Sequence, residues 1–89
     1  MNLSELATLL GKLYNNSPKQ EKVAMIHLFA IKYAEEIQEH NITAADLAKA
    51  AGLSKSYHVE ISKGLKRAKY VVCKDNVVEK LLYSMTPTG

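Results

Sequence analysis

Basic side chains are concentrated in one part of this 89-residue chain. Between positions 49 and 74, seven lysines and arginines are accompanied by a single acid, Glu60, so this segment carries a net charge of +6. The rest of the chain carries a net charge of −3. A localised basic surface is the electrostatic pattern expected for a polyanionic partner. The basic residues are Lys49, Lys55, Lys63, Lys66, Arg67, Lys69 and Lys74.

The residues that could support catalysis or bind a metal are scattered. His27, His40 and His58 fall on different predicted elements, and Cys73 is the only cysteine. One thiol can form neither a disulfide within the chain nor a cysteine-based metal site. No glycine-rich phosphate loop and no metal-ligand spacing is present. The sequence therefore predicts a protein that is not an enzyme and needs no cofactor or metal.

Composition and length are those of one soluble domain, with 47% hydrophobic and 24% charged residues. We expect residues 1–89 to form a single domain. The N-terminal segment lacks the basic region of a secretory signal. The most apolar stretch, 23–34, is interrupted by His27 and Lys32 and is too short to span a bilayer. We expect a cytoplasmic protein, nucleoid-associated when bound to its polyanionic partner.

The elements that must support the basic segment begin with a helix predicted over residues 3–14. Leucines recur along it at steps of three and four, which places them on one face. Asn2 and Glu5 have the spacing of a capping box at its start.

A second, longer helix is predicted to run to about Glu39. Ser17 is expected to cap it, with Pro18 at its first position and Gln20 closing a capping box. Its apolar stripe is wide, which implies burial on more than one side. We expect it to pack on the first helix and on the basic segment. The first two helices, residues 1–40, are also the natural seam for a homodimer.

Two short helices follow, separated by a glycine. Thr43 and Asp46 have the spacing of a cap for a helix over 44–51, and Gly52 is expected to end that helix in the left-handed conformation. Ser54 is then expected to cap a helix over 55–67. The inward face of that helix is predicted to hold Tyr57, Ile61, Leu65 and Ala68.

The C-terminal segment suggests β-structure. Residues 70–74 are rich in β-branched and aromatic side chains, so we expect a strand that is followed by a turn at Asp75 and Asn76. Residues 77–85 fit either the second strand of a hairpin or an amphipathic helix, and both readings stay open.

The corner AADLAKAAGLSKSYHVEISKGL, 44–65, resembles a helix-turn-helix. Ala48 occupies the place of the small residue four positions before the turn glycine. Leu53 matches the hydrophobic residue after that glycine, and Ser54 matches the usual cap. One position departs from the family pattern: His58 stands where the family has an inward apolar residue, so Tyr57 takes over the core contact or His58 is partly buried.

The resemblance extends to winged helix-turn-helix proteins of the multiple-antibiotic-resistance type, over residues 42–87. LKRAKYVV matches the end of their recognition helix and the start of the wing, and MTPTG, 85–89, is similar to the motif that closes the wing. The resemblance implies a mainly α fold of about four helices with a short C-terminal β-hairpin wing at 69–87. The alternative is a C-terminal helix in place of the second wing strand.

The resemblance also implies binding of double-stranded DNA, with residues 55–67 in the major groove, by a transcriptional regulator or DNA-targeting module. Lys55, Ser56 and Val59 would then reach bases, and Lys63 a base or a phosphate. Glu60 would accept from a cytosine or pair with a neighbouring lysine. The residues expected at the DNA are Thr43, Ser54, Lys55, Ser56, Val59, Glu60, Lys63, Lys66, Arg67, Lys69 and Lys74. The alternative is a winged-helix module that binds proteins without binding DNA.

Overall fold

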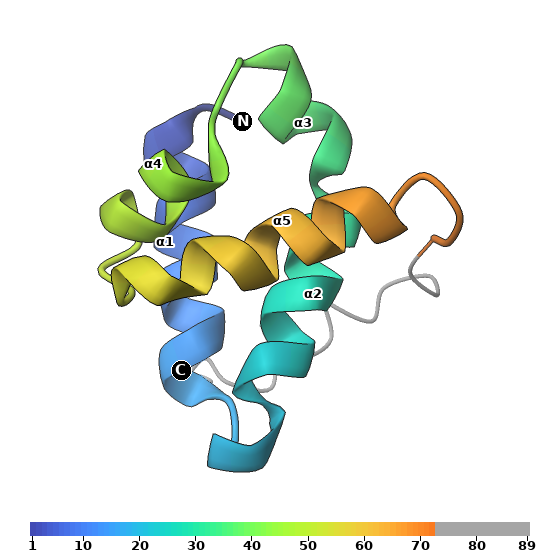
Figure 1. The fold of residues 1–89 in the computed structure, drawn as a ribbon. Helices are drawn as coiled ribbons and strands as arrows, with labels where there is room; N and C mark the ends of the chain where they lie inside the picture. Colours follow the sequence, from blue (N-terminus) through green and yellow to red (C-terminus); the bar gives the residue numbers. More distant parts are fainter. Residues whose placement is uncertain (73–89) are drawn as a thin grey trace, which may run out of the picture.

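A computed structural model describes residues 1–72, and in this range every regular element is a helix (Figure 1). Two of the elements are single 3₁₀ turns that lead into longer helices. In chain order the elements are α1 (Leu3–Asn16), η1 (Lys19–Glu21), α2 (Lys22–Lys32), α3 (Ala34–Glu39), α4 (Ala44–Ala50), η2 (Lys55–Tyr57) and α5 (His58–Arg67).

The start of α1 confirms the predicted capping box. Asn2 Oδ1 accepts a hydrogen bond from the Glu5 amide at 2.9 Å, and the Asn2 amide donates to Glu5 Oε1 at 3.3 Å. The helix continues two residues past the predicted end at Tyr14. The predicted role of Ser17 is wrong: its hydroxyl donates to the Leu13 carbonyl at 2.5 Å, so it closes α1 and does not cap the next helix.

The predicted long second helix is bent into two. Tyr33, with φ −108° and ψ 19°, separates α2 from α3. Helical hydrogen bonds continue across the bend, from the Tyr33 amide to Phe29 and from the Ile37 amide to Tyr33, each at 3.0 Å. Phe29 of α2 and Ile37 of α3 both belong to the same core. Within the described residues, no helix is both long enough and apolar enough to cross a membrane.

One hydrophobic core joins these helices, and α5 crosses α2 (Figure 1). Because the apolar stripes of α1 and α2 face this core, most of the surface expected to form a dimer seam is used inside the chain. Val23 remains outside, with 41% of its surface exposed. The largest fully buried side chains are Leu6, Leu10, Leu13, Ile26, Phe29, Ile37, Leu47 and Ile61.

The predicted β-hairpin wing is contradicted, because the described residues contain no strand. After α5 the amides of Tyr70 and Val71 both donate back to the Arg67 carbonyl, at 2.9 and 3.0 Å, so the chain turns. Tyr70 and Val72 are 86% and 89% exposed. Their β-branched and aromatic composition indicated a strand, but a strand forms only where another strand pairs with its backbone. The remainder of the predicted wing and the alternative helix over 77–85 lie outside the described residues.

Candidate nucleic acid interface

The turn between α4 and α5 has the hydrogen bonds of a Schellman motif. The Leu53 amide donates to the Ala48 carbonyl at 2.9 Å, and the Gly52 amide donates to the Lys49 carbonyl at 3.1 Å. Gly52 has φ +76°, a conformation that costs glycine no steric strain. Ala48 is fully buried, as expected where two helices meet closely. At the other end of α4, Thr43 Oγ1 accepts from the Asp46 amide at 3.0 Å, as predicted.

The rotation of α5 about its axis decides which side chains face solvent. Ile61 and Gly64 are buried, whereas Val59, Lys63 and Lys66 are exposed. The exposed residues are spaced four and three apart, so they form one outward face. Of the predicted inward face, Ile61 is buried and Tyr57 and Leu65 pack against the core, whereas Ala68 is half-buried outside that cluster.

Both alternatives that the sequence left open at His58 are present: Tyr57 takes over the core contact, and His58 is partly buried. Tyr57 packs on Tyr14 edge to face, with ring centroids 5.2 Å apart, and the Tyr14 hydroxyl donates to the Tyr57 hydroxyl at 3.0 Å. This hydrogen bond, with a smaller effect of burial, raises the pKa of Tyr14. His58 is half-buried, and its Nδ1 has no hydrogen-bond partner among the described residues.

Ser54 stands at the N-cap position of η2, as predicted, but its side chain makes no capping hydrogen bond. No side chain caps the start of η2; instead the Ser54 and Ser56 hydroxyls lie 3.2 Å apart and pair with each other. The first turn is a 3₁₀ turn, Lys55–Tyr57, and the α-helix begins only at His58. Lys55 and Ser56 are therefore presented on a tighter turn than the predicted continuous helix would give.

Glu60 does not share the outward face of α5. Its Oε1 lies 2.9 Å from His27 Nε2 of α2, and its Oε2 lies 3.7 Å from Lys63 Nζ. His27 Nδ1 in turn lies 3.1 Å from Arg67 Nη1. The predicted pairing of Glu60 with Lys63 is present. Sequence reasoning missed His27, because nothing in the sequence relates it to a residue 33 positions away.

Most of the predicted DNA-contacting residues lie on the surface of the described chain. Glu60 is half-buried, and Lys74 lies outside the described residues. Most of the others gather along η2 and α5, while Thr43 stands at the start of α4. The exposed members of the set are Thr43, Ser54, Lys55, Ser56, Val59, Lys63, Lys66, Arg67 and Lys69.

A comparison with known families agrees with this geometry. A family model described as HTH-like domain matches residues 2–74, which is most of the chain. The chain belongs to the HTH-like domain family. No curated protein and no solved structure gives a match. Membership indicates a DNA-binding function of the regulator type. The match also covers the helices that precede the helix-turn-helix.

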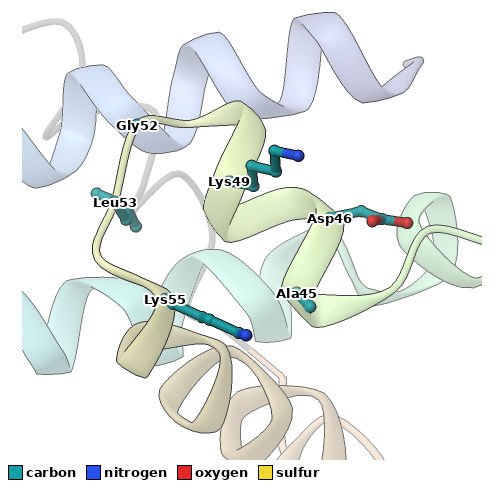
Figure 2. Close-up of a pocket in the computed structure, with 6 residues that line it drawn as sticks. All are labelled: Ala45, Asp46, Lys49, Gly52, Leu53 and Lys55. Carbon is teal, nitrogen blue, oxygen red and sulfur yellow. The ribbon is translucent and has the colours of Figure 1, made fainter.

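In this HTH-like domain the turn borders a hollow of about 510 Å³ between α4 and η2. Figure 2 shows that Asp46 and Lys49 come from α4 and that Lys55 comes from the segment after the turn. Leu53 and Gly52 complete the lining with Ala45. Two cations and one acid at an exposed turn make a polar border beside the start of the exposed face of α5.

Acidification below about pH 4.5, which protonates Glu60, is expected to weaken the junction between α2 and α5. The hydrogen bond from His27, helped by the charge of Lys63, lowers the pKa of Glu60 below its usual 4.5. A carboxyl whose pKa is lowered by folding stabilises the protein above its usual pKa, and this stabilisation is lost as the pH falls through the lowered value. Glu60→Gln should therefore be less stable than the wild type at neutral pH, and the difference should shrink below about pH 4.5.

Urea denaturation of both proteins at neutral pH and at about pH 3 measures this difference. Glu35→Gln, an exposed change on α3, is the matched control. A difference between Glu60→Gln and wild type that does not change with pH would contradict the assigned contact.

Proposed function

We propose that this HTH-like domain binds double-stranded DNA by placing η2 and the outward face of α5 in the major groove, as a transcriptional regulator or DNA-targeting module. The observation that carries the proposal is the rotation of α5. Its buried side holds Ile61 and Gly64, and its exposed side holds Val59, Lys63 and Lys66. A helix fits the major groove, where each base pair presents a distinct pattern of donors, acceptors and methyl groups.

The exposed residues divide into base contacts and phosphate contacts. Lys55 and Ser56 lie in η2, and Val59 lies on the outward face of α5. There they can contact base edges and, for Val59, a thymine methyl group. Lys66, Arg67 and Lys69 follow near the end of α5 and suit phosphates, as does Thr43 at the start of α4. Lys63 lies between the two groups and can reach either. Glu60 is held by His27 and Lys63, so we assign it no base contact.

Two copies on paired half-sites would give a specific complex, since one small module buries little surface. Because the stripes of α1 and α2 mostly face the core, the seam would use their exposed residues, of which Val23 is one. We further propose that residues 1–89 act as one domain, in the cytoplasm and on the nucleoid. The shared core of the described residues supports the single domain, and a DNA partner supports the location.

Alanine substitutions test the interface. Lys55→Ala and Lys63→Ala should each weaken duplex binding roughly tenfold, because each removes a positive charge from the proposed interface. Both side chains are exposed, so helical circular dichroism should not change. Fluorescence anisotropy with a labelled random-sequence duplex in low salt measures the affinity.

Lys19→Ala in η1 is the charge-matched control, since it removes an exposed lysine outside the helix-turn-helix. If Lys19→Ala weakened binding as much as Lys63→Ala, the contact would be a general effect of net charge. Absence of binding by the wild type in low salt would reject DNA in favour of a protein partner.

A further inference from the structure

His27 lies against the one face of α5 that is built from positions 60, 64 and 67. These positions are four and three apart, so their side chains lie in a row. Gly64, in the middle, brings the two backbones together: a Cβ added there would lie 2.9 Å from the His27 carbonyl oxygen and 3.2 Å from its Cα. The backbone of His27 is thus fixed at the centre of the row, and its ring lies between Glu60 and Arg67.

The hydrogen bonds of the ring require one particular neutral form. The Glu60 carboxylate only accepts, so His27 Nε2 carries the proton and donates at 2.9 Å. The Arg67 guanidinium only donates, and its Nη1 lies over the ring, 3.1 Å from His27 Nδ1 and 3.5 Å from His27 Nε2. Nδ1, the nearer nitrogen, therefore carries the lone pair that faces this donor. A neutral ring protonated on Nε2 satisfies both partners at once.

A doubly protonated ring cannot satisfy both partners. No lone pair would remain for the Arg67 donor, and two positive charges would lie in contact, since Nη1 lies 3.1 Å from one ring nitrogen and 3.5 Å from the other. Its bond to Glu60 would become charge-assisted and therefore stronger. The described polar contacts of the ring are all with α5, namely Glu60 and Arg67, with Lys63 next to Glu60. Protonation would thus retain Glu60 and expel Arg67.

We propose that His27 is a positioning residue of the DNA-binding surface: the neutral ring holds Arg67 away from phosphate, and the protonated ring releases it. The inference rests on the proposed function and adds a regulation to it. Histidine is the side chain that most often changes charge near physiological pH. Arg67 is exposed at the last turn of α5, so once released it is free to reach a phosphate. DNA binding should therefore strengthen in mild acid.

The affinity for a duplex at about pH 8 and at about pH 6 tests the proposal, with roughly a tenfold rise expected in mild acid for the wild type. His27→Gln should stay near the weaker affinity at both pH values, because its amide can donate to Glu60 and accept from Arg67 as the neutral ring does. Arg67→Gln should remove most of the rise although His27 is intact. His40→Gln, at an exposed histidine that follows α3, is the matched control and should keep the rise.

NMR of the free protein separates this inference from the proposed function. At about pH 8 the His27 ring should carry its proton on Nε2. As the ring titrates, the side-chain N–H signals of Arg67 should shift in wild type and in His40→Gln but not in His27→Gln. A neutral ring protonated on Nδ1, or Arg67 signals that ignore the titration, would overturn the inference even if DNA binds. An undiminished affinity rise in both His27→Gln and Arg67→Gln would also overturn it.

If no duplex binds at any pH, the proposed function fails, and the NMR titration alone decides whether Arg67 is released. If His27→Gln does not fold, Arg67→Gln and the wild-type titration carry the test.

Discussion

Duplex binding is expected to weaken by a factor on the order of 10²–10³ when monovalent salt rises from about 50 to about 200 mM. Each phosphate contact releases a condensed counterion, so the logarithm of the affinity falls linearly with the logarithm of the salt concentration. The exposed cations along η2 and α5 supply about four contacts while the neutral His27 ring holds Arg67, and about five once Arg67 is released, and both numbers give this magnitude. These cations are Lys55, Lys63, Lys66, Arg67 and Lys69.

The slope of the same titration counts these contacts. Replacing Lys66 by Ala should reduce the slope by about one contact and weaken binding similarly for every duplex sequence. Val59→Ala, on the same exposed face but without charge, should leave the slope unchanged and alter the preference among sequences. An affinity indifferent to salt would exclude the proposed phosphate contacts.

Gly64→Ala is expected to destabilise the fold by about 2 kcal/mol, although alanine favours a helix over glycine by about 1 kcal/mol. The added Cβ would lie 2.6 Å from the Ala30 Cβ and 2.9 Å from the His27 carbonyl oxygen. The second neighbour is backbone, so α2 and α5 would have to separate along the most extensive helix contact in the described chain. A domain of this size has about 4–13 kcal/mol of stability in total, so the loss is large.

Urea denaturation of Gly64→Ala measures this loss, with Val59→Ala as the control on the exposed side of the same helix. The control should change the free energy of unfolding by no more than about 0.5 kcal/mol. Because Gly64 packs directly against the His27 backbone, Gly64→Ala should also shift the side-chain N–H NMR signals of Arg67, which contacts the His27 ring. A Gly64→Ala protein as stable as the wild type would show that the two helices do not approach as closely as described.

Local features of this protein follow from the sequence because they depend on neighbouring residues. The capping box of Asn2 and Glu5 and the left-handed Gly52 are set by side-chain chemistry within a few positions. The burial of Ile61 followed from the helical repeat. Two predicted side-chain caps are absent: Ser17 and Ser54 are residue types that favour caps, but their hydroxyls form hydrogen bonds with other groups nearby. The strand expected from Tyr70 onward had the right composition without a described partner strand.

The sequence by itself determined that the chain is mainly helical, that a helix-turn-helix lies at its centre and that one face of its second helix is basic. Only the tertiary structure decided that α2 lies across α5 at Gly64, because that contact depends on two backbones meeting from distant parts of the chain. Because of the same crossing, Glu60 does not lie on the exposed face and instead hydrogen-bonds to His27, 33 residues away. Helical periodicity specifies which way a side chain points, whereas the group that it meets is set by how the helices pack.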